Sequence, residues 1–419
     1  MLEVAATGKA QALVDRARLW ARHAEMARFG ATPLGGVNRQ ALTAEEIDGR
    51  RCLIGWAREL GFAVSMDDMG NLFIRRPGSD DSLPPVLTGS HIDTQPSGGR
   101  FDGIYGILAG LEALQAIDAA GIATRRAIEV VTWMNEEGSR FSPGCMGSLA
   151  FADPARTSDL SAIQDLEGVT VADALAGLRL AFPDVPARKL GFVPAAFVEA
   201  HIEQGPRLEK ERKTIGVVTG IQGTRRFVVE VRGENAHAGT TPRRRRKDAL
   251  LAALRIVAGL EKLMRDPEDV VRFTIGRFIV SPGAPSVVPG HVLFSIDFRH
   301  PDDAVLEMRG DQVEPVCRKH AGKCDVVVKQ TSRTRPIEFA GLVPETIERA
   351  TERLGLPHIH MPSGAGHDAQ NLVKICPTGM IFVPCERGIS HNEAENAKPS
   401  DLAAGARVLA ETLVDLATR

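Results

Sequence analysis

Over most of its length the chain alternates strand patterns with helix patterns. Apolar or amphipathic helical segments are expected at residues 10–29, 43–61 and 103–120, and short buried strands at 85–89, 126–134, 195–200 and 379–384. Residues Thr43 and Glu46 have the spacing of a capping box at the start of the second helix. Strands separated by helices predict an α/β domain with a mixed, largely parallel sheet and helices on both faces.

The alternation changes once, in the middle of the chain. A strand at 225–232, a helix at 246–264, strands at 271–280 and 291–299, a helix at 302–320 and a strand at 324–330 follow one another. The order β-α-β-β-α-β is that of a ferredoxin-like domain. Because 419 residues are long for a single core, we predict an inserted domain at 214–332 that interrupts a larger domain formed by 1–213 and 333–419.

Composition excludes several classes of partner. The formal net charge is −2, with 43% hydrophobic and 25% charged residues, which does not favour nucleic acid or an anionic membrane. The six cysteines are scattered without a CxxC pair, as is typical of reduced thiols in a cytosolic protein. We find neither a signal-peptide pattern nor an apolar run long enough to cross a bilayer. We therefore expect a cytoplasmic protein.

Four strand ends carry side chains of the kinds that bind metals. His91 and Asp93 end the first strand, and Asp102 follows a glycine-rich turn. The other three ends carry the segments Asn135-Glu136-Glu137-Gly138, His201-Ile202-Glu203-Gln204-Gly205 and Ile389-Ser390-His391-Asn392. In open α/β sheets, ligands bind beyond the carboxyl ends of the strands. Imidazole and carboxylate together suit zinc, and also manganese, cobalt or nickel, so the sequence predicts a metal-dependent hydrolase.

Two metal ions need a bridging carboxylate, and Asp102 is the candidate. We expect Asp93 to accept the second ring N–H of His91 and fix its tautomer. The Glu136–Glu137 pair offers one metal ligand and one proton-transfer group. Each residue also has a structural interpretation, since a single histidine at a strand end is more often a hydrogen-bonded core residue and a glutamate pair is usually solvated. We assign that structural class to six of the eleven histidines: His23, His291, His300, His320, His358 and His360.

Seven segments carry a resemblance to a known family. They are GSHIDTQPSGGRFDG, WMNEEGSRF, HIEQGP, NAHAGTTP, DFRHP, SGAGHDAQ and ISHNEAE, between residues 89 and 395. With them the chain resembles the N-carbamoyl-L-amino acid hydrolase, β-ureidopropionase (β-alanine synthase) and allantoate amidohydrolase group of dinuclear zinc aminoacylase-type hydrolases. HIEQG and GHDA together distinguish this group from dipeptide metallopeptidases, which share the metal motifs.

The resemblance implies a specific set of metal ligands and a general base. One metal would bind His91 and His201, the other Glu137 and His391, with Asp102 bridging. Glu136 would be the general base. The larger domain would thus be the catalytic domain, and the inserted domain would serve as lid and dimerisation surface in a homodimer.

The same resemblance implies the substrate contacts. His237, reaching the site of a neighbouring subunit, would polarise the scissile carbonyl or stabilise the oxyanion. Arg299, also supplied across subunits, would bind the substrate carboxylate. Gln204 and His367 would line the pocket.

Two positions depart from the family pattern. Ser286 stands before the Val-Val-Pro-Gly turn, where relatives usually have an asparagine that contacts the substrate carboxylate. Arg243 stands where relatives commonly have an apolar residue, at the start of a run of five cations. A solvated helix N-terminus is one interpretation of that run, and a role at the site or at the dimer interface is the other, since the cations oppose the helix dipole.

The expected reaction is the hydrolysis of N-carbamoyl amino acids, α or β, to the amino acid, ammonia and carbon dioxide. Gln95, after the HIDT segment, favours the carbamoylase and β-ureidopropionase members. Allantoate or another ureido acid is the alternative substrate, and an N-acyl amino acid is the third. A non-catalytic binder of the same fold would be expected to lose the ligands or the base, and both sets are present here.

Overall fold

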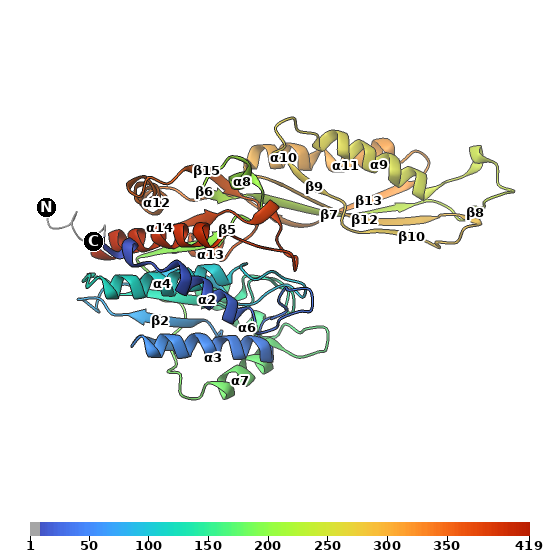
Figure 1. Cartoon of the computed structure of the whole chain (residues 1–419). Helices are drawn as coiled ribbons and strands as arrows, with labels where there is room; N and C mark the ends of the chain where they lie inside the picture. The colour runs from blue at the N-terminus through green and yellow to red at the C-terminus, as the bar shows by residue number, and fades with distance from the viewer. Residues whose placement is uncertain (1–8) are drawn as a thin grey trace. The chain divides into compact units, whose positions relative to one another are not determined.

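The structure, a computed structural model, describes residues 9–419 (Figure 1). Contacts divide the chain into two compact units, one formed by the residues up to Thr219 and from Phe339 onward, the other by Gly220–Glu338. The second unit begins and ends six residues later than the predicted insertion, 214–332. The second unit begins later than predicted because strand β6 (Ile215–Ile221) pairs with the first unit's strand β16 (Thr378–Val383).

The first unit contains a mixed sheet, as the sequence predicted. Its strands run in the order β1-β2-β4-β3-β5-β16-β6, and β15 and the short β14 also pair with β6. Strand β3 pairs in parallel with β4 and β5, and β5 with β16, whereas β1–β2, β2–β4 and β16–β6 are antiparallel. The remaining bounds are β1 Ala63–Met66, β2 Leu72–Arg76, β3 Val86–His91, β4 Ile128–Trp133, β5 Ala196–Ile202, β14 Ile337–Glu338 and β15 His358–Ser363.

Helices cover both faces of this sheet. Val130 and Trp133 of β4 point to opposite faces because side chains alternate along a strand. Val130 packs against helix α4, and the Trp133 ring meets Phe151 of α5 with centroids 5.1 Å apart. The helices of this unit are η1 Gln11–Leu13, α2 Arg16–Met26, α3 Ala44–Glu59, α4 Ile104–Ala119, α5 Met146–Ala152, η2 Pro154–Arg156, α6 Thr157–Ser161, α7 Val171–Ala181, α8 Arg207–Lys210, α12 Leu342–Arg353, α13 Ala369–Leu372, η4 Glu386–Gly388 and α14 Pro399–Thr418.

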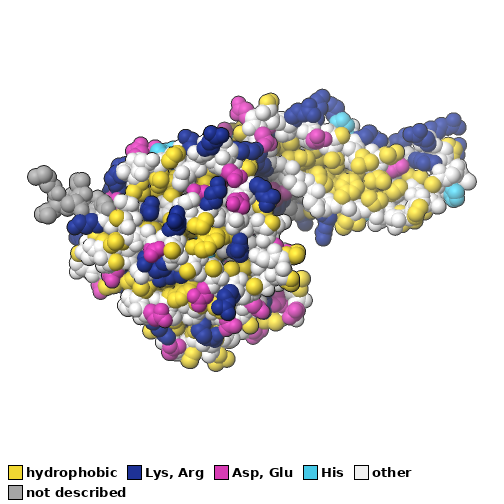
Figure 2. Space-filling model, viewed as in Figure 1, with side chains coloured by type: hydrophobic (Ala, Val, Ile, Leu, Met, Phe, Trp, Pro, Cys, Tyr) yellow, Lys and Arg dark blue, Asp and Glu magenta, His cyan; other side chains and the backbone are white. Residues whose placement is uncertain are grey.

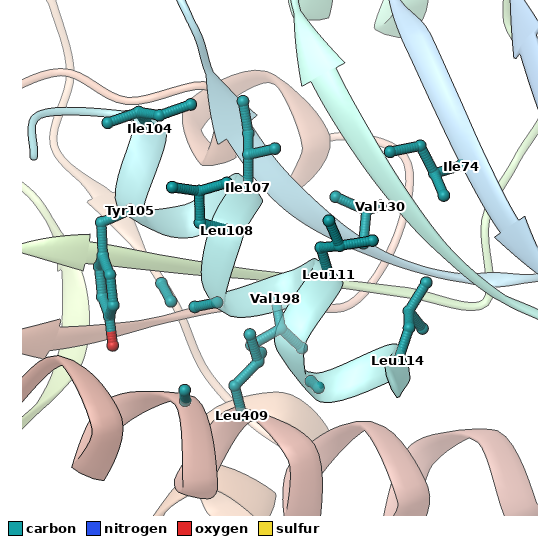
Figure 3. Close-up of a cluster of buried hydrophobic side chains, with 14 of the residues drawn as sticks. Ile74, Ile104, Tyr105, Ile107, Leu108, Leu111, Leu114, Val130, Val198 and Leu409 are labelled. Carbon is teal, nitrogen blue, oxygen red and sulfur yellow. The ribbon is translucent and has the colours of Figure 1, made fainter. Parts of the chain in front are cut away.

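Helix α4 forms the centre of the core. It is apolar on nearly every side, as expected for a helix enclosed by other elements, and it lies between the sheet and α14 (Figure 3). Leu111 and Leu108 lie among Val130, Val198 and Leu409 in this layer (Figure 3). The helix begins at Ile104, directly after the loop that carries Asp102, so the core fixes where that carboxylate can lie.

The second unit is a smaller antiparallel sheet with helices on one face. Its strands run in the order β10-β12-β7-β13, and β9 pairs with β12 alongside β10. Buried side chains such as Val229, Phe294 and Ile256 form a separate core between sheet and helices. The bounds are β7 Gly223–Arg232, β8 Ala236–His237, η3 Arg243–Arg245, α9 Ala249–Met264, β9 Arg272–Thr274, β10 Phe278–Ser281, β11 Val287–Val288, β12 His291–His300, α10 Asp303–Asp311, α11 Val313–His320 and β13 Asp325–Thr334.

Three predicted elements are each divided in two. The helix expected at 10–29 is η1 and α2, because Asp15 adopts a non-helical backbone and caps α2 by accepting hydrogen bonds from Ala17 and Arg18. The helix expected at 302–320 is α10 and α11, because Pro315 cannot donate a backbone hydrogen bond. The strand expected at 271–280 is β9 and β10, separated where Arg277 donates its N–H to the Ser295 hydroxyl.

The predicted capping box at the start of α3 is wrong. Thr43 is the N-cap residue, but its side chain makes no cap hydrogen bond and donates instead to the carbonyl of Gln40. Glu46 accepts from the N–H of Leu42, one residue earlier than a capping box requires, and forms a fully buried ion pair with Arg50. Glu46 therefore belongs to the core, where the buried guanidinium of Arg50 orients its carboxylate.

In the part of the chain that the structure describes, no helix is long and apolar enough to cross a membrane. All six cysteines are free, and five of them are buried.

Candidate active site

The four predicted strand-end segments meet at one edge of the first sheet. His91 ends β3, the glutamate pair follows β4, and His201 lies near the end of β5. The neighbours β4, β3, β5 and β16 are mutually parallel, so their carboxyl ends lie at the same edge. His391 comes from the loop that follows β16 and η4.

The first cluster is His91, Asp102 and His201, whose ligand atoms all lie within 4.8 Å of one another. The Nε2 atoms of His91 and His201 lie 3.7 and 3.2 Å from Oδ1 of Asp102. All three side chains are buried. Gly103 makes this approach possible, because a Cβ there would lie 2.3 Å from the His91 ring and its φ of +66° favours glycine.

The second cluster is Asp102, Glu137 and His391. Nε2 of His391 lies 3.3 Å from Oδ2 of Asp102 and 3.4 Å from Oε2 of Glu137. Asp102 therefore belongs to both clusters, with one carboxylate oxygen toward each. That is the arrangement predicted for a bridging ligand.

Three non-glycine residues around these clusters have left-handed backbone. They are Asn135, Gln204 and His391, with φ of 54°, 56° and 52°. Such conformations are costly and tend to occur where function requires a particular side-chain direction. Two of these residues, Gln204 and His391, direct their side chains to Oδ2 of Asp102, at 2.8 and 3.3 Å. Asn135 instead donates to the carbonyls of Phe141 and Pro143 in the loop that carries the glutamate pair.

The electrostatics of the clusters centre on Asp102. Burial acts to raise its pKa, but hydrogen bonds from His201 and His391 outweigh burial and hold the pKa well below its ordinary value. The hydrogen bond with Asp102 raises the pKa of His391 to about 9. For His201, burial acts in the opposite direction, yet the bond to Asp102 prevails and the pKa is again about 9. Burial lowers the pKa of His91 to about 4.

Glu136 lies beside the clusters but is a member of neither. Its Oε2 is 3.6 Å from Nε2 of His91, and the Cys145 thiol donates to its Oε1 at 3.3 Å. Burial, followed by the charges of Asp368 and Glu137, raises its pKa well above the ordinary value. A carboxyl group with a raised pKa next to a candidate metal centre is suited to proton transfer near neutral pH.

Asp93 is close to His91, but the predicted contact is wrong in one detail. Nδ1 of His91 is 2.9 Å from the backbone carbonyl of Asp93 and 3.8 Å from its carboxylate. The carboxylate instead accepts the backbone N–H groups of Glu136 and Glu137, at 3.2 and 3.1 Å. Asp93 thus orients both the histidine and the glutamate pair, through different atoms.

Comparisons with known proteins identify the family. Residues 87–415 match the family described as Peptidase family M20/M25/M40. The chain belongs to peptidase family M20/M25/M40. An N-carbamoyl-L-amino-acid amidohydrolase of Rhizobium meliloti is 39% identical over 96% of this chain and 97% of that protein. An allantoate amidohydrolase of Escherichia coli is 37% identical over 94% and 96%.

A solved structure shows the same likeness. An amidase of the hydantoinase/carbamoylase family from Burkholderia multivorans is 44% identical, with a TM-score of 0.90 over 97% of this chain and 98% of that one. The resemblance predicted from the seven sequence segments is therefore confirmed.

Two supporting residues of this M20 member were missed in the sequence. Glu395 is buried and accepts the backbone N–H groups of Phe101 and Asp102, while its other oxygen accepts the Ser390 hydroxyl. Glu395 thereby ties the Asp102 loop to the His391 loop. The only signal was its place in the ISHNEAE segment.

The second missed residue is Gln95. Its side-chain Nε2 donates to Oε2 of Glu137 at 2.7 Å, and its backbone N–H donates to Oε1 at 3.2 Å. Both oxygens of the predicted metal ligand are thus oriented by one residue. Gln95 had drawn attention in the sequence only as a family marker.

Among the substrate-contact candidates, His367 and Gln204 lie with the clusters in the first unit. The ring of His367 packs edge-on against His201, with centroids 4.5 Å apart, and its Nε2 is 2.8 Å from the Ser363 hydroxyl. Burial lowers the pKa of His367 well below its ordinary value. His367 therefore packs directly against the proposed ligand His201.

The other three candidates lie in the second unit. His237 is on β8, which pairs with β11. Ser286 directly precedes β11, and its backbone carbonyl accepts the backbone N–H of Ala238 at 3.0 Å. His237 and Ser286 are therefore neighbours. Arg299 lies on β12 of the larger sheet, where its Nε donates to Asp297 at 3.1 Å.

Proposed function

We propose that this M20 family member hydrolyses the carbamoyl C–N bond of N-carbamoyl amino acids, using two divalent metal ions in the first unit. The main support for the proposal is that two ligand clusters share Asp102, with Glu136 beside them. Relatives named N-carbamoyl-L-amino-acid amidohydrolase over nearly the whole chain support the substrate class. The products would be the amino acid, ammonia and carbon dioxide.

The donor set fits a pair of divalent cations. His91 and His201 would hold one, Glu137 and His391 the other, and Asp102 would bridge them. Burial, with the nearby charge of Asp102, raises the pKa of Glu137 to about 8, so the site concentrates carboxylates that a cation would neutralise. Zinc suits these ligands best, with manganese, cobalt or nickel as alternatives. Such ions lower the pKa of a water molecule and polarise a carbonyl group.

Glu136 would act as the general base. Its carboxylate would take a proton from the attacking water and later deliver it to the leaving nitrogen. Its raised pKa supports both steps, because the group can hold the proton between them. The Cys145 thiol donates to Oε1, which leaves Oε2, the oxygen nearer His91, for proton transfer.

His237 would donate a hydrogen bond to the oxygen of the carbamoyl group. Its Nδ1 accepts the backbone N–H groups of Gly239 and Thr240, at 3.0 and 3.1 Å. Because Nδ1 is an acceptor in both contacts, the ring proton is on Nε2. The Nε2–H group is thus prepared to donate to developing negative charge. Arg299 would bind the substrate carboxylate, and Ser286, beside His237, would shape the same part of the pocket.

The inserted unit would be a ferredoxin-like lid and dimerisation domain, with His237 and Arg299 reaching the partner subunit's site. Its strand order, β10-β12-β7-β13 with α9, α10 and α11 on one face, supports the fold assignment. Exposed apolar side chains support a protein partner, including Leu254 of α9 and Ile279 of edge strand β10. Figure 2 shows hydrophobic side chains gathered on one face of this unit.

Allantoate is the second candidate substrate. The relatives named allantoate amidohydrolase are nearly as similar to this chain as the carbamoylases are, at 37% and 36% identity. Allantoate is also a ureido acid, so the same residues would serve. An N-acyl amino acid hydrolysed in a shifted pocket is the third candidate, because Ser286 departs from the family's usual asparagine.

The test is ammonia and amino acid release by the zinc- or manganese-loaded enzyme. The panel would contain N-carbamoyl-β-alanine, N-carbamoyl-L-α-amino acids, allantoate, and N-acetyl and N-formyl amino acids. Metal-dependent turnover of the carbamoyl compounds above all others is expected. Turnover confined to the acyl compounds, or no turnover of any ureido compound, would overturn the proposal.

A further inference from the structure

Two histidines alternate along β15 on the surface of the first unit. His358 and His360 are two residues apart, so their side chains leave the strand on the same face. Met361 and Ser363, on the other face, are buried, whereas His358 is half-buried and His360 is exposed. The sequence alone favoured a structural role for both histidines, but their shared face presents two imidazoles to solvent.

A carboxylate from a helix completes the group. Glu348 lies on α12, whose buried residues Val343, Ile347 and Ala350 anchor the helix in the core. Oε1 of Glu348 is 2.8 Å from Nε2 of His360. The ligand atoms of Glu348, His358 and His360 lie within 4.8 Å of one another, a spacing that a single ion can bridge.

A backbone contact fixes the tautomer of His358. Its Nδ1 is 3.1 Å from the backbone carbonyl of Leu356. A carbonyl can only accept, so Nδ1 carries the proton and Nε2 carries the lone pair. A ring N–H held by a carbonyl is the usual orientation of a metal-binding histidine.

We propose that Glu348, His358 and His360 form a third divalent-cation site, which shares no residue with the clusters on Asp102. Two imidazoles and one carboxylate suit a late first-row ion such as Zn²⁺, Ni²⁺ or Cu²⁺, which would displace the proton between His360 Nε2 and Glu348. The site is at the surface, so water completes the coordination and the ion exchanges with solvent. This proposal does not depend on the proposed function.

The alternative is a surface ion pair between Glu348 and His360, which would contribute little to stability. A pair uses only two of the three groups and assigns no part to His358, whose ligand atom lies within 4.8 Å of the other two. The two interpretations differ in one measurable quantity, which is the number of metal ions bound per chain.

The experiment is equilibrium dialysis of the full-length enzyme against Zn²⁺, with bound zinc measured per chain. The test variant is His358→Ala/His360→Ala, and the matched control is His300→Ala/His320→Ala, which removes two imidazoles elsewhere. The wild type and the control should each bind one more zinc per chain than the test variant. None of these histidines lies in the clusters on Asp102, so both zinc-loaded variants should retain turnover. Retained turnover would show that the variants are folded.

Equal zinc binding by the wild type and the test variant would overturn the proposal. The same loss of one zinc in the control would also overturn it, because the loss would then not depend on these two histidines. A diffraction measurement at the zinc edge should place the additional ion between β15 and α12. Anomalous density confined to the Asp102 clusters would contradict the site directly.

Discussion

The two units differ in how deeply they bury their functional side chains, although His391 of the first unit is itself exposed. In the first unit, His91, His201 and Asp102 are at most 3% exposed, and buried backbone and side-chain hydrogen bonds fix their directions. In the second unit, His237 and Ser286 are exposed, at the end of the unit that carries β8 (Figure 1). The first unit is thus built for a fixed arrangement of charge, and the second for contact with a molecule that arrives from solvent.

We propose that this difference reflects a division of labour, with metal chemistry in the first unit and substrate recognition in the second. A change at the clusters on Asp102 is expected to alter metal content and the chemical step together. A change in the second unit is expected to alter catalysis while the metal content stays the same.

Removal of metal should abolish turnover. Dialysis against a chelator would leave Glu136, Glu137 and Asp102 close together without a cation, and zinc or manganese should restore the rate. Because a ligand that binds only the folded state stabilises it, the apo enzyme should also have a lower Tm. Turnover that persists after metal analysis shows both ions removed would contradict the assignment of the clusters.

His237→Ala should lower kcat by about 10²- to 10³-fold, the typical cost of one lost hydrogen bond to an oxyanion. Zinc per chain should not change. The matched control is His291→Ala, which removes another imidazole of the second unit. The His291 ring contacts Glu230, and this variant should keep a near-normal rate. A fall in metal content on changing His237 would show that the two functions are not separate.

Arg246→Ala should lower kcat by about 10-fold through a small displacement of His237. The guanidinium donates to the carbonyls of Ala238 and Thr241, at 2.7 and 2.9 Å, and so holds the turn whose N–H groups orient His237. Arg244→Ala removes a neighbouring cation and is the control. Equal effects of the two changes would mean that charge at this end of the unit, and not the turn, is what matters.

His23→Phe should alter stability without altering turnover. His23 is buried against Phe101 and Tyr105, and burial lowers its pKa to about 3. Between the unfolded pKa of 6.5 and that value, only the unfolded chain binds the proton, so stability falls as pH falls, by about 1.4 kcal/mol per pH unit. The variant should lose this dependence in chemical denaturation at pH 7.5 and pH 5. An unchanged pH dependence would show that His23 does not cause it.

The sequence predicted the cluster residues because the fold itself brings strand ends together. Once β3, β4 and β5 are recognised as neighbouring parallel strands, residues that follow them must meet at one edge. The inserted domain was predicted for a similar reason, since its order of strands and helices is visible in the periodicity of side chains.

What the sequence could not predict depends on side-chain directions and long-range contacts. Glu395 contacts the N–H of Phe101 across 294 residues, and no local pattern records such a contact. The contact between Asp93 and His91 depends on backbone geometry, because the Asp93 backbone carbonyl, and not its carboxylate, is hydrogen-bonded to Nδ1 of His91. The division of the predicted helix into α10 and α11 was also missed. The helical pattern is continuous in the sequence, and only the missing backbone N–H of Pro315 indicates the break.

The most direct test of the account is the turnover and metal content of Glu136→Gln, measured on the same preparation. Glutamine has nearly the same shape and keeps the site filled, but it cannot accept a proton from water. We expect the same zinc per chain as in the wild type and a loss in kcat of about 10²- to 10⁴-fold, the range for general acid–base catalysis. A near-normal rate with full metal content would contradict the assignment of Glu136 as the base.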